Sequence, residues 1–408
     1  MMFSSRGQVL CSSALNTLTT HPDWTLPDYA GGSILNLAAS LAKHFGVGVP
    51  HAPLRNALPL EDVETVVLLI VDGLGQWQLE KHIRDGDAPN LERLMQNHSQ
   101  VITSVFPSTT MAAMTSIHTA TPPAQSGWLG YTMWLEETQT LTEMIGQVDM
   151  STRRPLEDKS FLAAVPSIYS SYAAAGVNVY AVQPQGYRGS WLNDWYWRGA
   201  AQLGYVSANS LGSVALPALE VSGKKLIVLY WADYDSVCHK YGPSSAAASD
   251  EIAAVDSAVG RLLARLPRDG ETALIVTADH GQIDLDPEKA VYLERDLWLV
   301  DRLRGPPAGD RLCRTFRVKP NQQGAVRDHL RRYGNVLNAN DAWEASLFGG
   351  APAAANFRSR VGDLIVMPHT GSQLCWTFSG KQPSKPHRGS HGGLSHAQMR
   401  VPLLSVRV

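Results

Sequence analysis

The stretch Val66-Val-Leu-Leu-Ile-Val71, followed at once by Asp72, decides the fold of this 408-residue chain. Two further runs share its character and lead to acidic or imidazole side chains: Leu226-Ile-Val-Leu-Tyr-Trp231 before Asp235, and Ala273-Leu-Ile-Val-Thr-Ala278 before Asp279 and His280. Unbroken runs rich in Val, Ile and Leu are typical of parallel strands that helices cover on both faces. Ligands of such sheets bind beyond the carboxyl ends of the strands, so these side chains are expected to converge on one site.

Composition and charge are those of a soluble globular protein. Hydrophobic residues make up 44% of the chain and charged residues 18%, with a net charge of −2. This balance gives no reason to expect a nucleic-acid polymer or a membrane as partner, and no apolar stretch reaches the roughly 20 residues of a membrane span. The N-terminal residues lack the apolar core of a signal peptide, so a cytoplasmic location is expected. The sequence leaves the oligomeric state open.

The four cysteines show no paired spacing. They are scattered along the chain: Cys11, Cys238, Cys313 and Cys375. We expect free thiols in a reducing compartment rather than a disulfide framework or a thiolate metal site.

The order of predicted elements indicates an α/β fold with a mostly parallel central sheet sandwiched by helices. Helices are predicted at residues 32–45, 89–96, 161–175 and 249–266, the last capped by Ser249, and strands at residues 65–71, 101–105, 177–182 and 401–408. Residues 1–60 are expected to form an extension packed on the core. Residues 61–301 and 361–408 would form the core, which a strand at 362–367 resumes. Residues 302–360 read as a small α+β insertion that could be a lid or an oligomer contact.

A candidate nucleophile lies in Ser108-Thr-Thr110, which opens a predicted helix after Phe106-Pro107. A hydroxyl group in the first turn of a helix faces free N–H groups and the positive end of the helix dipole. Both favour an alkoxide and a bound phosphate, which makes Thr110 a candidate and Thr109 its rival. The alternative is that these residues are ordinary helix caps.

Four further segments offer metal ligands. Asp72 follows the first buried strand, where an ionised carboxylate needs a partner such as a metal ion; the alternative is a helix N-cap in the loop after the strand. Asp235 and His239 are four residues apart, so they share one side of a turn from which Cys238 points away. Gly281 permits the irregular turn that would let Asp279 and His280 reach one ion. His391 lies in a glycine-rich loop, and His369, His387 and His396 compete with it for the same role.

The combined donor set contains three aspartates, three histidines and a threonine: Asp72, Asp235, Asp279, His239, His280, His391 and Thr110. Oxygen and imidazole ligands without thiolate suit two Zn²⁺ ions, with Mn²⁺ or Fe as alternatives. Two such ions about 4 Å apart could activate the threonine and hold both oxygens of an in-line displacement at phosphorus. The corresponding non-enzymatic alternative is a binding protein that retains metal ligands.

These motifs resemble those of the alkaline phosphatase superfamily, and within it the type I phosphodiesterase/nucleotide pyrophosphatase family. The resemblance rests on five ordered motifs: Ile70-Val-Asp-Gly73, Phe106-Pro-Ser-Thr-Thr110, Asp235-Ser-Val-Cys-His239-Lys-Tyr-Gly-Pro243, Thr277-Ala-Asp-His-Gly281 and His391-Gly-Gly-Leu394. It implies a phosphodiesterase or nucleotide pyrophosphatase whose substrate is a small phosphate ester, including nucleotides.

The resemblance also implies the role of each residue. One zinc ion would be held by Asp235, His239 and His391. The other would be held by a second set of four residues: Asp72, Asp279, His280 and the hydroxyl group of Thr110. Thr110 rather than Thr109 would attack phosphorus and form a phospho-threonine intermediate, which water would then hydrolyse.

Several residues depart from the family pattern and bear on the substrate. Tyr131 stands where diesterases of the family usually carry an asparagine, and Thr109 and Met111 flank the nucleophile instead of the usual Phe or Lys. No arginine lies close to Thr110 in sequence, whereas a phosphomonoester usually needs one. Aromatic residues such as Trp128 could form an apolar wall beside a diester, or could simply pack in the core. We therefore expect a diester or pyrophosphate substrate, with a phosphomonoester or phosphonate as alternatives.

Overall fold

A seven-stranded sheet forms the centre of the structure, a computed structural model that describes residue 18 and residues 21–378 and 384–408. In spatial order its strands are β2 (His98–Thr103), β18 (Arg400–Arg407), β9 (Thr272–Thr277), β1 (Thr65–Val71), β8 (Lys225–Trp231), β6 (Asn178–Pro184) and β7 (Ala201–Tyr205). Only β18 runs antiparallel to its neighbours. The predicted fold class, a mostly parallel sheet between helices, is confirmed.

The three apolar runs that predicted the sheet occupy its middle. Every residue of β1, β8 and β9 is buried, as continuous apolar strands require when helices cover both faces. The register pairs Val71 with Trp231 and Ile70 with Thr277, so the three strands end at nearly the same level. The residues that follow them therefore meet at one edge of the sheet.

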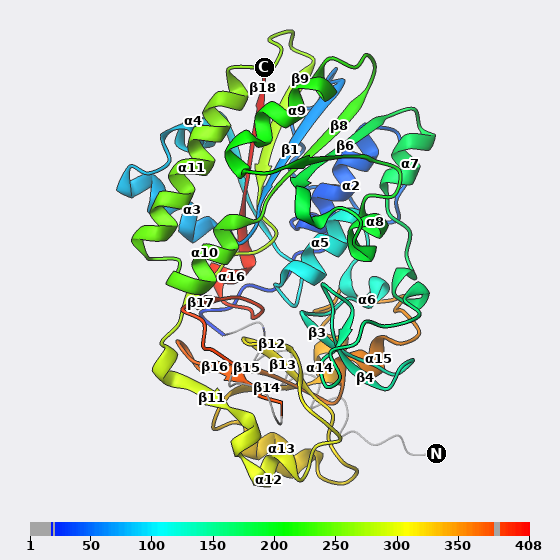
Figure 1. Cartoon of the computed structure of the whole chain (residues 1–408), viewed down its shortest axis with the longest axis vertical. Coiled ribbons are helices and arrows are strands. Elements are labelled where there is room, and N and C mark those ends of the chain that lie inside the picture. The colour runs from blue at the N-terminus through cyan, green and yellow to red at the C-terminus, as the bar shows by residue number, and fades with distance from the viewer. Residues whose placement is uncertain (1–17, 19–20, 379–383) are drawn as a thin grey trace.

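Helices cover both faces of this sheet (Figure 1). One layer contains α3 (Gln76–Asp85), α4 (Pro89–Asn97), α9 (Leu211–Leu219), α10 (Asp233–Tyr241) and α11 (Ala246–Leu263). The other contains α2 (Ile34–His44), α5 (Thr110–Thr119), α7 (Tyr169–Ala174) and α8 (Trp191–Tyr196). Helix α2 contributes several buried aliphatic side chains to the main core, which ties the N-terminal part of the described chain to the sheet.

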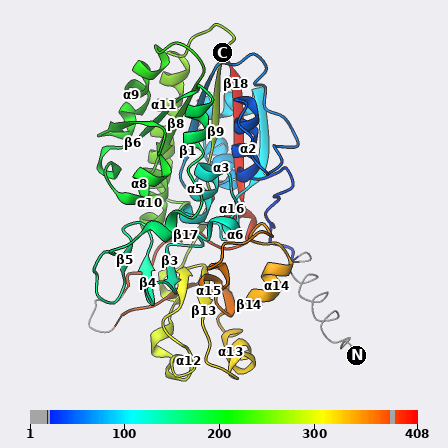
Figure 2. The same cartoon turned by 90° about the vertical axis from the view of Figure 1, so that its right-hand side faces the viewer.

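A smaller part of the chain lies below the main sheet, beyond the short strand β17 (Gly389–Ser390) (Figure 1 and Figure 2). It is built on a four-stranded antiparallel sheet: β12 (Ala308–Asp310), β13 (Cys313–Phe316), β15 (Leu364–Pro368) and β14 (Gly334–Asn338). Beside it lie α12 (Leu297–Val300), α13 (Gln323–Leu330), α14 (Ala339–Glu344), α15 (Phe357–Val361) and the strand pair β11 (Ala290–Tyr292) and β16 (Gln373–Cys375). This part has a hydrophobic cluster of its own, which includes Leu299, Phe316 and Val366. A third small sheet consists of β3 (Thr132–Leu135), β4 (Thr140–Glu143) and β5 (Val148–Asp149).

Three predicted elements differ from the structure. The strand expected to resume the core at residue 362 is β15, which pairs with β13 and β14 in the small sheet. Its Leu364 and Val366 side chains fill the second hydrophobic cluster, whereas Ile365 and Met367 pack with the main core. The helix predicted at 161–175 is a short 3₁₀ turn followed by α7, since Pro166 disfavours helical geometry at its predecessor. The hydroxyl group of Ser245, rather than that of Ser249, caps α11 by accepting a hydrogen bond from Ala248 N.

The cysteines within the described residues are free and buried: Cys238, Cys313 and Cys375. Cys11 lies outside the described residues. None of the described helices combines the length and the apolar character that crossing a bilayer requires.

Candidate active site

The predicted ligands gather where the strands of the main sheet end. Asp72 follows β1, and Asp279 and His280 follow β9. Asp235 and His239 lie one turn apart on α10, and the remaining two residues come from elsewhere: His391 directly after β17 and Thr110 at the first position of α5. Segments that are distant in sequence thus contribute to a single cluster.

His280 lies among the carboxylates of one group of candidate ligands. Its Nε2 is 3.6 Å from Asp72 Oδ1 and 3.3 Å from Asp279 Oδ2. One ligand atom from each of the three residues lies within 4.8 Å of the others. Asp72 Oδ1 and Asp279 Oδ2 are buried and have no hydrogen-bond partner among the described residues.

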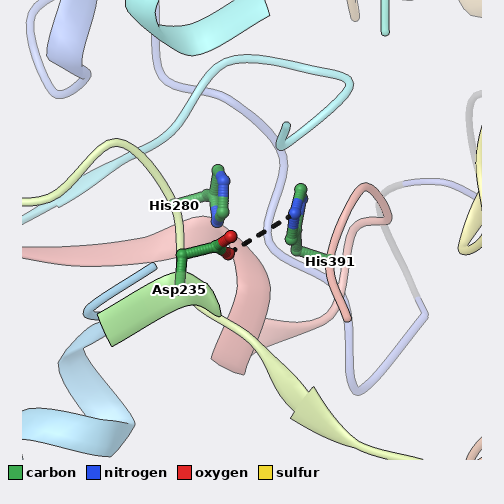
Figure 3. Close-up of side chains that lie close together, drawn as sticks. All are labelled: Asp235, His280 and His391. Atoms are coloured by element: carbon green, nitrogen blue, oxygen red, sulfur yellow. Dashed lines mark ion pairs between the residues drawn. The ribbon is translucent and has the colours of Figure 1, made fainter. Parts of the chain in front are cut away.

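A second group combines Asp235, His280 and His391, again with ligand atoms within 4.8 Å of one another (Figure 3). His391 Nε2 lies 3.7 Å from Asp235 Oδ1, and the His391 ring stacks on that of His280 with 3.7 Å between centroids. His239 approaches the same carboxylate from the other side, with its Nε2 3.3 Å from Asp235 Oδ2. The six aspartate and histidine side chains predicted as metal ligands therefore lie together.

Backbone carbonyl groups fix the orientation of the three histidine rings. The Nδ1 atom of His239 lies 2.8 Å from Gly389 O, and that of His391 lies 3.0 Å from Ser108 O. His280 Nδ1 lies 3.2 Å from Gly281 O. A carbonyl oxygen can only accept, so each Nδ1 carries a proton and each Nε2 of a neutral ring presents a lone pair. This arrangement is typical of histidines that bind a metal through Nε2.

The donor chemistry of the cluster fits divalent cations. Imidazole lone pairs and carboxylate oxygens face one another at 3.3 to 3.7 Å, a repulsive arrangement unless a cation lies between them. Burial and the neighbouring carboxylates raise the pKa of Asp72, and burial raises the pKa of Asp279. Burial, together with nearby His280, lowers the pKa of His391. The surroundings of Asp72, Asp279 and His391 thus oppose unpaired carboxylate charge and keep His391 neutral, which suits a metal ion. Asp235 and His239 differ: burial acts against both charges, but their mutual contact lowers the pKa of Asp235 and raises that of His239.

Thr110 lies beside the histidine that the two groups share. Its Oγ1 is 3.1 Å from His280 Nε2, and it lines both of the cavities described below. Thr109 is the N-cap residue of α5, is buried, and hydrogen-bonds through its side chain to Asp310. The geometry therefore leaves Thr110, rather than Thr109, with a hydroxyl group directed at the cluster.

Two cavities meet at Thr110. The larger, about 530 Å³, contains Thr110 and the candidate ligands and is closed on its far side by residues of the small sheet, including Asp310, Arg311 and Arg314. The smaller, about 340 Å³, is mainly apolar. Its walls include Met111, Met114, Leu192, Tyr187 and Tyr196, with the side chains of Gln183, Asn193 and His118 also present. Both volumes are in the range of small-molecule sites.

The two predicted substrate contacts have different outcomes. Tyr131 is 44% exposed and lines the larger cavity, as a substrate contact requires. Trp128 is fully buried, stacks on Trp195 and donates from Nε1 to Leu162 O, and it lines neither cavity. Contrary to the sequence prediction, Trp128 is a core residue.

Several residues at the site escaped the sequence analysis. Gln282 donates from Nε2 to Asp235 Oδ1 at 2.6 Å, and the hydroxyl group of Tyr230 donates to Asp72 Oδ2. Gln282 directly follows the Asp279–Gly281 motif, so its position in the sequence could have indicated a role at the site. The sequence around Tyr230 is that of an ordinary strand residue and gives no such indication. His387, whose ring lies 4.5 Å from that of His239, was considered only as a competing ligand.

Comparisons with known proteins agree with this picture. A family model described as type I phosphodiesterase / nucleotide pyrophosphatase matches residues 66–394. Among solved structures, murine ectonucleotide pyrophosphatase / phosphodiesterase 5 is 18% identical with a TM-score of 0.62, covering 83% of this chain and 87% of that one. Phosphonoacetate hydrolase from Sinorhizobium meliloti 1021 is 20% identical with a TM-score of 0.62, covering 83% and 89%. At this identity the solved structures show a shared fold.

One curated relative matches over a short stretch only. It is a 2,3-bisphosphoglycerate-independent phosphoglycerate mutase from Rhodopseudomonas palustris, 40% identical over 85 residues. The match spans 20% of this chain and 16% of the length of that relative.

Proposed function

Because this chain belongs to the type I phosphodiesterase / nucleotide pyrophosphatase family, we propose that it is a metal-dependent hydrolase of phosphoric esters or pyrophosphates in which Thr110 is the nucleophile. The observation that carries the proposal is the position of Thr110 Oγ1, 3.1 Å from the Nε2 atom of His280, the residue common to both groups of candidate ligands. A hydroxyl group there lies where a phosphoryl group held by the cluster would be attacked.

The candidate ligands would divide into two sets. Asp235, His239 and His391 would hold one ion, and the second set would hold the other: Asp72, Asp279, His280 and Thr110. Zn²⁺ suits this mixture of imidazole and carboxylate donors, with Mn²⁺ or Fe as alternatives. When bound, the two ions would supply positive charge to activate the hydroxyl group and to stabilise the transferred phosphoryl group.

The chain itself contributes position and local polarity. Thr110 is the first residue of α5, so the free N–H groups of the first turn would be available to a phosphoryl group bound beside it. In the first half of the reaction, the Thr110 oxygen forms a bond to phosphorus while the bond to the leaving group breaks. In the second half, water attacks the resulting phospho-threonine, releases phosphate or a monoester, and restores the hydroxyl group.

The smaller cavity supports a substrate with an organic leaving group. It opens at Thr110 and offers apolar walls such as Met111 and Tyr196 beside the amide groups of Gln183 and Asn193. Such a pocket suits a flat group with polar edges, including a nucleoside. Murine ectonucleotide pyrophosphatase / phosphodiesterase 5, whose fold this chain shares, has been solved as an inactive Thr-to-Ala variant in complex with AMP. A diester or pyrophosphate substrate, with nucleotides among the candidates, follows from these features.

Phosphonate or phosphomonoester hydrolysis is the second candidate. Arg311 and Arg314 line the larger cavity, although no arginine is close to Thr110 in sequence, so the argument against a dianionic group is weaker than the sequence suggested. Phosphonoacetate hydrolase, whose fold this chain shares, also supports phosphonate hydrolysis as the second candidate.

The decisive experiment replaces Thr110 by alanine. With zinc supplied, wild-type protein should release p-nitrophenol from bis-p-nitrophenyl phosphate, p-nitrophenyl phenylphosphonate or p-nitrophenyl phosphate, and the relative rates would identify the preferred bond. Thr110→Ala should lower kcat on the order of 10³-fold or more while the protein still binds zinc. Thr110→Ser, which keeps a hydroxyl group, should retain measurable turnover. Full activity of Thr110→Ala would overturn the proposal, as would a protein that binds substrate but never turns it over.

A further inference from the structure

Two arginines of the small sheet form part of the wall of the catalytic cavity. Arg311 lies in the turn between β12 and β13, and Arg314 lies in β13. Both line the 530 Å³ cavity that also contains Thr110, Asp235 and His391. Burial first, and then the nearby charge of Arg311, lower the pKa of Arg314 to about 10.

Neutral acceptors hold the guanidinium group of Arg311. Its Nη1 donates to Gln373 Oε1 at 3.1 Å and to Cys375 Sγ at 3.0 Å. Its Nη2 donates to Ser384 Oγ at 2.9 Å. These contacts fix the position of the group without neutralising its charge.

Arg314 is held in the same way. Its Nε donates to Leu374 O at 3.1 Å and its Nη1 to Gly309 O at 3.0 Å. Within the described residues, no carboxylate forms an ion pair with Arg311 or Arg314 at 4.0 Å or less, and residues 1–17, 19–20 and 379–383 contain no Asp or Glu. Two fixed cations without a direct ion-pair partner among the described residues therefore face a polar cavity, although Asp310 is near enough to favour the charged form of Arg314.

Asp310, the acidic residue nearest to them in sequence, is engaged elsewhere. Its Oδ2 accepts a hydrogen bond from Tyr131 N at 3.1 Å, and its carboxylate also accepts from the side chain of Thr109. Asp310 thus joins the small sheet to the loop that precedes Thr110. It forms no ion pair with Arg311 or Arg314 at 4.0 Å or less, so the N–H groups that these two side chains do not give to neutral acceptors can bind another anion.

We propose that Arg311 and Arg314 bind a second anionic group, a phosphate or a carboxylate, on the substrate whose phosphoryl group Thr110 attacks. The inference rests on the proposed function and narrows it to substrates that carry two anionic groups. Planar guanidinium groups pair with carboxylate and phosphate oxygens in matching geometry, and preset donors of this kind select for such groups. The small sheet would then determine which phosphoric ester the main sheet hydrolyses.

The test uses full-length protein loaded with zinc and carrying Thr110→Ala, so that ligands are bound but not consumed. Calorimetry would compare three probes: methylphosphonate with one anionic group, pyrophosphate with a second phosphate, and phosphonoacetate with a carboxylate. Adding Arg311→Gln or Arg314→Gln should weaken the binding of a doubly anionic probe about 10- to 100-fold more than the binding of methylphosphonate. This is the loss of affinity expected when a charge-assisted hydrogen bond is removed. A selective loss for either probe supports the proposal and identifies the second group.

The matched control is Arg331→Gln, an arginine of the same part of the chain whose side chain is 64% exposed, and it should leave all three affinities unchanged. Arg311→Lys, which keeps the charge but loses the planar donor pair, should give an intermediate loss and guards against misfolding of the glutamine variants. Equal weakening of all three probes, or none, would overturn the proposal. If wild-type protein hydrolyses no p-nitrophenyl ester yet shows the arginine-dependent selectivity, the proposed function fails while the anion site remains.

Discussion

Gln282 offers a direct test of the candidate metal centre because it contacts Asp235 without lining either cavity. It is fully buried, and its Nε2 donates to Asp235 Oδ1 at 2.6 Å and to Asp235 O at 3.2 Å. Gln282→Met keeps the shape of the side chain and removes the donor. A hydrogen bond to a charged acceptor contributes about 1.5–3 kcal/mol, which corresponds to roughly 10- to 100-fold in affinity. We expect zinc to bind more weakly by that factor, as is usual when the partner of a metal ligand is lost.

The assay is zinc competition against a chelating dye, followed by turnover at saturating zinc. Turnover should largely recover once zinc is in excess, because substrate does not touch Gln282. Gln147→Met is the matched control: Gln147 is also buried, but its amide nitrogen donates to Met144 O and Ile145 O, so zinc affinity should not change. An unchanged zinc affinity in Gln282→Met would refute the assignment of Asp235 as a ligand.

Three further predictions concern packing and titration. Gly281→Ala should destabilise the protein by roughly 1–3 kcal/mol or more, because a Cβ atom there would lie 2.0 Å from Ala397 O, and thermal unfolding would show the loss. Burial lowers the pKa of His118 to about 3, whereas in the unfolded chain it stays near 6.5. As the pH falls from about 6.5 towards 3, the unfolded chain therefore gains a proton on His118 that the folded protein does not, and the fold loses stability. His118→Phe should reduce the slope of the unfolding free energy against pH in that range by up to about 1.4 kcal/mol per pH unit. Cys238 is buried with a raised pKa caused mainly by burial, so Cys238→Ala should keep its zinc and its turnover, and loss of zinc would contradict a purely structural role.

Much of the main sheet and its ligands could be predicted because the signals are local. The run from Val66 to Val71 is apolar at every position, which specifies a central strand and places the following Asp72 at the edge of the sheet where ligands bind. Helical spacing likewise placed Asp235 and His239 on one side of α10. For Gly281 the structure adds a reason that the sequence did not show, because a Cβ atom there would lie too close to Ala397 O.

The other features of the site depend on contacts between segments that lie far apart in the sequence. Arg311 and Arg314 follow the Asp279 motif by some thirty residues and belong to another sheet, so proximity to Thr110 in sequence could not reveal them. Trp128 was misassigned because an aromatic residue near a nucleophile fits a cavity wall and a core equally well. Only the packed structure distinguishes these cases.

The position of β18 has a consequence for folding of the chain during its synthesis on the ribosome. This strand, residues 400–407, lies between β2 and β9, so the main sheet stays open between these two strands until residues 400–407 have been synthesised. The edge of β9 whose end carries Asp279 and His280 would meanwhile be unpaired in the nascent polypeptide. Synthesis that stalls or terminates shortly before residue 400 should therefore yield a polypeptide whose unpaired strand edge pairs with other chains. Such a polypeptide should aggregate rather than show reduced activity.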